Sequence, residues 1–361
     1  MLLFEPSTSR GATDSRRSHG EPLESPRRRG LVDGGEMLVP TWKRVSLPSR
    51  IGWRWSPALS GGRHTVVVRT IWIPPQLADA VDEDDYPGRV SWLAALPARV
   101  DQVAAVWGLE LGEPYLPGGQ CAWVAPARNL AGDALVLKVG WRHREAEHEA
   151  DALRFWEGDG AVRCVATRSL EDTTALLLER CVPGVPLNCS LPEPAQDVVL
   201  AGLTRRLWAH RPVDGHPFGS LAAMCDQWAE SFELDFDADS RGLDPGLARA
   251  GMAMLREVPR TAQRSVLLCT DLHAGNVLCS QREPWLVIDP KPFIGDPAFD
   301  AVQHILNCEE RLATDPEGLS RRMAELLELD PERVRLWLLA RCAQESLHDP
   351  MMRELARRLA P

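Results

Sequence analysis

In the first half of the chain the apolar residues fall into short runs, with two stretches of helical spacing between them. We expect helices from Ser91 to about Trp107 and from about Arg142 to Trp156, with Ala150 and Leu153 on the apolar face of the second. Four apolar runs have the length and composition of strands: CAWVAPA, ALVLKVG, AVRCVATR and TALLLERC. This part of the chain is predicted to form a small sheet that carries one helix between its strands.

From about residue 194 the apolar residues recur at helical spacing over long stretches. The run VLLCT and a hairpin of NVLCS and WLVIDP read as strands among these helices. A sheet-rich first half and a helical second half predict an α+β fold with two lobes. We expect a small β-rich N-lobe over residues 71–182 and a larger helical C-lobe over residues 183–361.

Residues 1–70 differ in composition from the rest. They are rich in Arg, Ser, Pro and Gly without a periodic apolar pattern, which predicts a disordered basic extension. The alternative is a start codon assigned too early, with Met37 as one internal candidate. This segment has 12 Lys+Arg against 6 Asp+Glu, so its charge of +6 precedes a body of −16. An acidic body argues against nucleic acid and anionic membranes as partners and favours cationic ligands.

The nine cysteines are scattered, their number is odd, and no C-x-x-C pair occurs. This distribution favours reduced thiols in a cytoplasmic protein over a disulfide framework or a metal cluster. No apolar run reaches the roughly eighteen residues expected of a membrane span. The first residues, MLLFEPSTSR, lack the basic and long apolar regions of a secretory signal.

The stretch VLLCTDLHAGNVLCSQREPWLVIDPKP carries the strongest chemical signal. Asp271 is followed five positions later by Asn276, and the hairpin brings Asp289 back at the end of an apolar strand. Phosphoryl transfer needs such a set, because one carboxylate accepts the proton of the attacking hydroxyl while an amide oxygen and a second carboxylate hold Mg²⁺. The spacing is that of protein kinases without the arginine of H-R-D. The alternative for Asp271 and Asn276 is a capped turn.

Lys138 lies within the apolar strand LVLKVG and is one of three lysines in the chain, with Lys43 and Lys291. A lysine kept where arginine serves elsewhere indicates a need for a compact ammonium group. In the kinase arrangement a strand lysine holds the α- and β-phosphates, and a helix glutamate orients it. Glu145 and Glu149 lie one turn apart on one side of the next helix. Glu149 is the better candidate, because it directly precedes the apolar part of that helix.

The glycine-rich element is less specific. PYLPGGQCAWV contains Gly118 and Gly119 but not G-x-G-x-x-G. These two glycines are candidates for contact with phosphate, and an ordinary hairpin turn is the alternative.

Taken together, these motifs resemble the aminoglycoside phosphotransferases, and within them the streptomycin and hydroxyurea kinase group. The matching stretches cover nearly all of the chain after the basic segment, and DLHAGN with IDPKPFIGDPAFD is a fairly specific pair among them. The resemblance implies a protein-kinase-like fold with Asp271 as catalytic base. It also implies Asn276 and Asp289 as Mg²⁺ ligands, with Lys138 and Glu149 acting on the phosphates of ATP.

The resemblance further places LLLERC at the hinge between the lobes, where Glu179 and Cys181 would meet adenine through backbone groups. Two features depart from it. The first 70 residues have no counterpart, and Cys269–Thr270 stand where many relatives of the wider superfamily have His-Gly. The second departure concerns the packing of the catalytic loop and leaves the base itself in place.

Acidic residues after the metal motif are candidates for binding a cationic substrate in the helical lobe: Asp296, Asp300, Glu309 and Glu310. The alternative for Asp300 is capping or pairing within the lobe, and for the two glutamates it is simple solvation.

The leading hypothesis is an ATP-dependent O-phosphotransferase acting on a hydroxyl of an aminoglycoside or aminocyclitol antibiotic, such as streptomycin, and inactivating it. An alternative keeps the fold and changes the acceptor to a metabolite alcohol, such as a sugar, an amino alcohol or a choline-like compound. A third hypothesis is a catalytically silent kinase-like protein that binds nucleotide or a partner. The sequence leaves open the natural substrate, the hydroxyl, the choice between ATP and GTP, and the oligomeric state.

Overall fold

The computed structural model describes residues 71–82 and 88–360, so the expectation for residues 1–70 lies outside the described part of the chain. The first two described elements are helices, α1 (Pro75–Asp82) and α2 (Arg89–Trp107). The second corresponds to the helix expected from Ser91 to about Trp107. It ends at Gly108, whose left-handed backbone (φ 62°) turns the chain toward the first strand.

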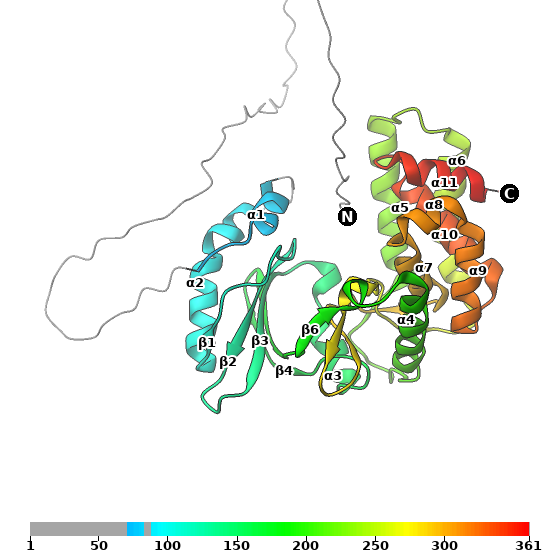
Figure 1. The fold of residues 1–361 in the computed structure, drawn as a ribbon. Helices are drawn as coiled ribbons and strands as arrows, with labels where there is room; N and C mark the ends of the chain where they lie inside the picture. The colour runs from blue at the N-terminus through cyan, green and yellow to red at the C-terminus, as the bar shows by residue number, and fades with distance from the viewer. Residues whose placement is uncertain (1–70, 83–87, 361) are drawn as a thin grey trace, which may run out of the picture. The chain divides into compact units, whose positions relative to one another are not determined.

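The N-terminal sheet has five antiparallel strands in the order β1-β2-β3-β5-β4. Its strands are β1 (Glu110–Leu111), β2 (Ala122–Arg128), β3 (Ala134–Trp141), β4 (Cys164–Leu170) and β5 (Thr173–Glu179). Along β3 the side chains alternate between faces. Leu137 and Val139 pack into the cluster that contains Trp92 of α2, which lies along the sheet (Figure 1). Val136 packs into a different cluster, and Lys138 shares its face of the strand.

The helix expected from about Arg142 to Trp156 is shorter in the structure. A 3-10 turn, η1 (Arg144–Ala146), precedes α3 (Glu149–Phe155). The polar run RHREAEH offers little apolar surface to pack against the sheet, and His143 is extended (φ −134°, ψ 161°). Glu149 therefore stands in the first turn of α3, where its side chain is buried.

Two small sheets follow. One has the order β10-β9-β6 and the other β7-β11-β8. Their strands are β6 (Pro183–Pro186), β7 (Gly219–Ser220), β8 (Val266–Leu268), β9 (Val277–Ser280), β10 (Trp285–Val287) and β11 (Phe293–Gly295). The antiparallel pair β9–β10 corresponds to the hairpin expected from NVLCS and WLVIDP. This hairpin connects the DLHAGN loop to Asp289.

Helices make up most of the remaining chain. They are α4 (Glu193–Trp208), α5 (Leu221–Ala238), α6 (Pro245–Glu257), α7 (Ala298–Leu306), α8 (Glu309–Thr314), α9 (Pro316–Leu327), α10 (Pro331–Glu345) and α11 (Pro350–Leu359), with 3-10 turns η2 (Leu187–Cys189), η3 (Val258–Thr261) and η4 (Ala274–Asn276). None of the described helices is both long and apolar enough to cross a membrane.

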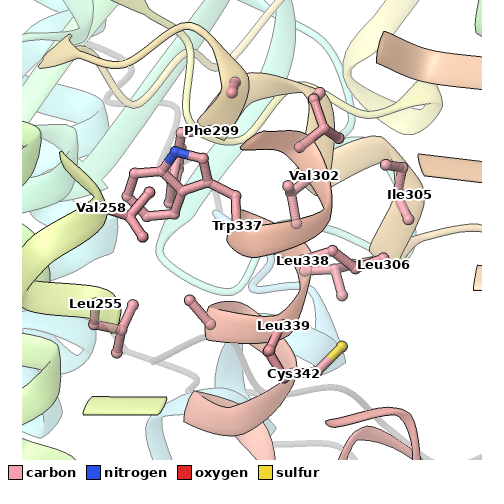
Figure 2. Close-up of a cluster of buried hydrophobic side chains, with 14 of the residues drawn as sticks. Leu255, Val258, Phe299, Val302, Ile305, Leu306, Trp337, Leu338, Leu339 and Cys342 are labelled. Carbon is pink, nitrogen blue, oxygen red and sulfur yellow. The ribbon is translucent and has the colours of Figure 1, made fainter. Parts of the chain in front are cut away.

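The helical core fixes α7, the helix that follows the metal motif. Phe299 of α7 and Trp337 of α10 meet edge to face with ring centroids 5.0 Å apart, and Figure 2 shows them among buried aliphatic side chains. Every residue of α7 is buried. Because such a helix cannot rotate without breaking its packing, its polar side chains have fixed directions.

Candidate active site

The loop between β8 and η4 places Asp271. The N–H of Asp271 donates to Cys269 O over 2.7 Å, and Thr270 between them is left-handed (φ 49°). The buried carboxylate of Asp300, in the first turn of α7, accepts the N–H groups of Thr270 (2.8 Å) and Cys269 (3.2 Å). It also accepts Trp208 Nε1 over 2.9 Å. Three donors on one carboxylate hold this unusual turn, and with it the position of Asp271.

The expectation that Asp296 and Asp300 meet a substrate is corrected by this packing. Both oxygens of Asp300 are occupied by the protein's own donors, and the residue is 4% exposed. Asp296 is 2% exposed and accepts Arg333 Nε and Trp337 Nε1, each over 2.6 Å. The fold turns both carboxylates into the helical lobe, where they hold the loop and the helices together.

Asp271 is held from two sides. Gln303 Nε2 donates to Asp271 Oδ1 over 3.1 Å. Asn276 Nδ2 donates to the main-chain oxygen of Asp271 over 2.9 Å and makes a longer contact of 3.4 Å with Oδ2. Burial raises the pKa of Asp271 to about 6, and the positive charge of Lys291 opposes that rise. Such a carboxylate is mostly ionised at neutral pH and has the basicity to accept a proton from a hydroxyl.

Asp289 stands at the end of the β9–β10 hairpin, in the left-handed region (φ 52°). Its Oδ1 accepts Lys138 Nζ over 2.6 Å and Lys291 Nζ over 2.5 Å. Burial alone would raise the pKa of Asp289, but the two ammonium groups hold it well below its usual range. This carboxylate therefore keeps its negative charge at physiological pH.

Lys138 joins the sheet to this hairpin. Besides Asp289, its Nζ donates to Glu149 Oε2 over 2.6 Å, so Glu149 rather than Glu145 is the partner that the structure brings to the lysine. Burial raises the pKa of Glu149, and the Lys138 ammonium opposes the rise. Glu149 Oε1 is buried without a hydrogen-bond partner among the described residues.

Asn276 and Asp289 present the oxygen donors that a hard divalent cation prefers. Within the described chain, Asn276 makes its side-chain hydrogen bonds through Nδ2, which leaves Oδ1 for another ligand. Asp289 uses Oδ1 for both lysines, which leaves Oδ2. The donor set therefore fits Mg²⁺ or a similar cation.

A second group with metal-binding side chains does not fit a cation. Asp197, His304 and Cys308 place their ligand atoms within 4.8 Å of one another, in the one such group of the described residues. The carboxylate of Asp197, however, also bonds the guanidinium groups of Arg311 (2.9 Å) and Arg322 (2.6 Å). Burial alone would raise the pKa of Asp197, but His304 and these arginines hold it well below its usual range. Two guanidinium groups on the only carboxylate would repel a metal ion, so we interpret this group as a structural polar network.

Gly118 and Gly119 lie in the connection between β1 and β2. Gly118 has φ 100°, and a Cβ at this position would stand 2.7 Å from Pro74 Cβ. Glycine at position 118 is thus explained by its backbone conformation and by close packing against the segment before α1. Contact of this loop with phosphate stays a prediction.

Glu179 and Cys181 lie where β5 ends. The Glu179 carboxylate accepts Arg282 Nε over 2.8 Å and Arg282 Nη2 over 3.0 Å, so its side chain is already engaged. Cys181 is buried, and burial raises the pKa of its thiol to about 11. Any contact with adenine would fall to backbone groups here, as the resemblance implies, and it stays a prediction.

Glu309 and Glu310 are exposed in the first turn of α8. Glu310 borders a shallow cavity of about 380 Å³, which Arg311 and Arg322 also line. Of the four acidic residues proposed for a cationic substrate, these two keep carboxylates that face solvent.

Two residues of the site escaped the sequence analysis. Lys291 contacts Asp289, and the signal available was its rarity as one of three lysines. Gln303 contacts Asp271 from α7. Its only signal was a polar residue inside an apolar helix, which does not by itself indicate a partner.

A two-lobed α+β fold with a strand lysine, a loop carboxylate and a hairpin carboxylate defines the protein-kinase-like phosphotransferases. A solved structure shows the same fold: amicoumacin kinase hAmiN in complex with AMP-PNP, Ca²⁺ and Ami has a TM-score of 0.54. It is 11% identical and covers 76% of this chain and 98% of that one.

The chain belongs to the family described as aminoglycoside/hydroxyurea antibiotic resistance kinase, whose model matches residues 111–348. A streptomycin 6-kinase of Streptomyces griseus is 32% identical over 288 residues, which are 77% of this chain and 91% of that protein. A hydroxyurea phosphotransferase of Kitasatospora aureofaciens is 34% identical over 260 residues, 71% of this chain and 74% of that protein. The family predicted from the motifs is confirmed, and the chain is a phosphotransferase.

Proposed function

We propose that this protein transfers the γ-phosphoryl group of Mg·ATP to a hydroxyl of an aminoglycoside antibiotic, streptomycin in particular. The observation that carries the proposal is geometric: the strand lysine Lys138 bonds both the helix glutamate Glu149 and the hairpin carboxylate Asp289. The two candidate carboxylates of the site also differ in their tendency to ionise. The pKa of Asp271 is raised to about 6, whereas that of Asp289 is held low by two ammonium groups. The first suits proton acceptance at neutral pH, and the second suits a permanent negative charge beside a cation.

In this mechanism Asp271 orients the acceptor hydroxyl and takes its proton while the hydroxyl oxygen bonds to the γ-phosphorus. The bond from that phosphorus to the β–γ bridging oxygen breaks, and ADP leaves. Lys138, anchored by Glu149, holds the α- and β-phosphates. Asn276 and Asp289 would hold Mg²⁺, which when bound neutralises phosphate charge.

The acceptor is proposed from relatives and charge. Streptomycin 6-kinases from two Streptomyces species are each 32% identical to this chain. The chain after residue 70 carries −16, since it has 29 Lys+Arg against 45 Asp+Glu. Streptomycin has guanidinium groups, which carboxylates bind through bidentate charge-assisted hydrogen bonds. We assign that contact to the exposed Glu309 and Glu310.

The same proposal includes a cytoplasmic location. All nine cysteines lie in the described part of the chain and are free thiols. Free thiols suit a reducing compartment, and ATP is available there.

Hydroxyurea is a second candidate acceptor, because a hydroxyurea phosphotransferase is 34% identical to this chain. The test is incubation with Mg·ATP and, separately, streptomycin, hydroxyurea, a neutral sugar and an amino alcohol. Mass spectrometry then looks for one added phosphate, with Asp271→Asn as the inactive control. Product from hydroxyurea alone selects the second acceptor. Product from the sugar or amino alcohol alone would replace the antibiotic by a metabolite.

A further inference from the structure

Two ammonium groups share one oxygen of Asp289, but their surroundings differ. Lys138 Nζ has a second carboxylate partner, Glu149, at 2.6 Å. Lys291 Nζ hydrogen-bonds Asp289 Oδ1 at 2.5 Å and has no other hydrogen-bond acceptor among the described residues. The Lys291 side chain is 17% exposed, so its charge is largely withdrawn from water.

The main chain of Lys291 is fixed to the catalytic loop. Its N–H donates to Cys269 O over 2.8 Å, and its carbonyl oxygen accepts Thr270 Oγ1 over 2.6 Å. Among the charged groups that act on the pKa of Asp271, Lys291 has the largest influence. Its ammonium group thus belongs to the loop that carries Asp271, whereas Lys138 belongs to the sheet.

A divalent cation at Asp289 changes the balance between the two lysines. It brings positive charge to a carboxylate that already bonds two ammonium groups, and the repulsion is strong where water is scarce. Lys138 keeps Glu149 as its partner. Lys291 loses its only carboxylate partner and needs another anion within reach of its flexible stem.

We propose that Lys291 turns from Asp289 to the γ-phosphoryl group when metal and nucleotide bind, and is there a catalytic residue. This inference rests on the proposed phosphotransfer and adds one residue to it. The Lys291 side chain bonds the proposed metal carboxylate Asp289, and its main chain bonds the loop that carries the proposed base Asp271. Lys291 therefore links the two groups that would bring the phosphoryl group and the acceptor together. Lys291 keeps its proton throughout and stabilises the charge on the transferring oxygens by hydrogen bonding.

The test distinguishes binding of the γ-phosphoryl group from binding of the rest of the nucleotide. Lys291→Met keeps the stem and removes the ammonium group, and Lys291→Gln keeps a donor for Asp289 without the charge. Calorimetry in Mg²⁺ compares ADP with AMP-PNP. We expect each variant to bind Mg·ADP within about threefold of the wild type and to lose roughly tenfold or more in affinity for Mg·AMP-PNP. Turnover should fall by about a hundredfold or more.

Lys138→Met is the matched control and should weaken the binding of both nucleotides. Equal losses for the two nucleotides in the Lys291 variants, or no loss for either, would overturn the assignment and leave Lys291 as a partner of Asp289 alone. Circular dichroism and melting curves establish that the variants fold, and the glutamine variant carries the test if the methionine variant does not. Absence of nucleotide binding by the wild type would instead overturn the proposed function together with this inference.

Discussion

Gln303 Nε2 donates a hydrogen bond to Asp271 Oδ1 over 3.1 Å, from a helix that follows the metal motif in the chain. Gln303 is 4% exposed and α7 is buried along its length, so the direction of this amide is fixed. Among the residues that the structure describes, Asp271 Oδ2 has only the longer contact of 3.4 Å with Asn276. We infer that Oδ2 is the oxygen that receives the acceptor proton.

The first prediction concerns the base. If Asp271 is the base, it acts in its ionised form. Because burial raises its pKa to about 6, kcat/KM should then rise with pH through about 6 and level off above it. Asp271→Asn should bind Mg·ATP nearly as well as the wild type and turn over roughly a hundredfold or more slowly, the usual scale for losing a general base. Steady-state rates from pH 5 to 9 and nucleotide calorimetry check both statements. Turnover within a few-fold of the wild type would remove Asp271 from this role.

The second prediction follows from the contact with Gln303. Its N–H stabilises the ionised form of Asp271, so Gln303→Met should raise the pKa of the base. Gln303→Glu should raise it further, because a like charge then lies beside it. The acidic limb of the kcat/KM profile should move up by about one pH unit or more in the glutamate variant, with affinity for Mg·ADP unchanged. A limb that stays in place in both variants contradicts the orienting role.

The sequence predicts those parts of the site that lie in contiguous motifs. D-x-x-x-x-N and the hairpin identify Asp271, Asn276 and Asp289, and the strand–helix order identifies Lys138 and Glu149. Two other contacts depend on the directions that the fold gives to side chains. Gln303 reaches Asp271 from a helix 32 residues further along the chain. Lys291 reaches Asp289 because the left-handed backbone of Asp289 turns the chain back toward the loop.

The local sequence pattern could not predict which acidic side chains are buried. The sequence around Asp296 and Asp300 does not show that these side chains are buried, because their partners lie far away in the chain. Arg333 and Trp337 of α10 bond Asp296, and Trp208 of α4 bonds Asp300. In the fold, the helix around α3 is also shorter than its sequence pattern predicts. No residue of the polar run RHREAEH before Glu149 is fully buried, and tertiary packing decides where such a helix begins.

The third prediction tests Asp300 as the residue that holds the catalytic loop. Asp300→Ala leaves the N–H groups of Cys269, Thr270 and the Trp208 indole without their acceptor. An unsatisfied buried donor costs about 1–3 kcal/mol, so the free energy of unfolding should fall by about 3 kcal/mol or more. Turnover should fall as well, since the loop loses its support.

Urea denaturation measures the change in the free energy of unfolding. The exposed Glu309→Ala is the control and is expected to stay within about 0.5 kcal/mol of the wild type. A loss under about 1 kcal/mol for Asp300→Ala would show that the loop is held by other contacts.

The fourth prediction concerns the metal. Asp289→Ala removes the carboxylate that would ligate Mg²⁺ and also leaves Lys138 and Lys291 without their shared partner. Nucleotide binding should lose its dependence on Mg²⁺, because the cation then has no charged protein ligand to bridge to the phosphates. Calorimetry of ADP binding with and without Mg²⁺ measures this dependence. Wild-type affinity for Mg·ADP in this variant would show that the metal is held elsewhere.

The last prediction concerns the acceptor. If Glu309 and Glu310 bind the guanidinium groups of streptomycin, they stabilise the bound substrate and the transition state by the same free energy. Glu309→Gln and Glu310→Gln should then raise KM for streptomycin severalfold and change kcat little. The effect should shrink as ionic strength rises, because both carboxylates are exposed and salt screens them. Glu354→Gln, an exposed carboxylate on α11, is the matched control and should leave KM unchanged. Steady-state kinetics at two salt concentrations decide the matter, and KM values equal to the control's would place the drug's cationic groups elsewhere in the protein.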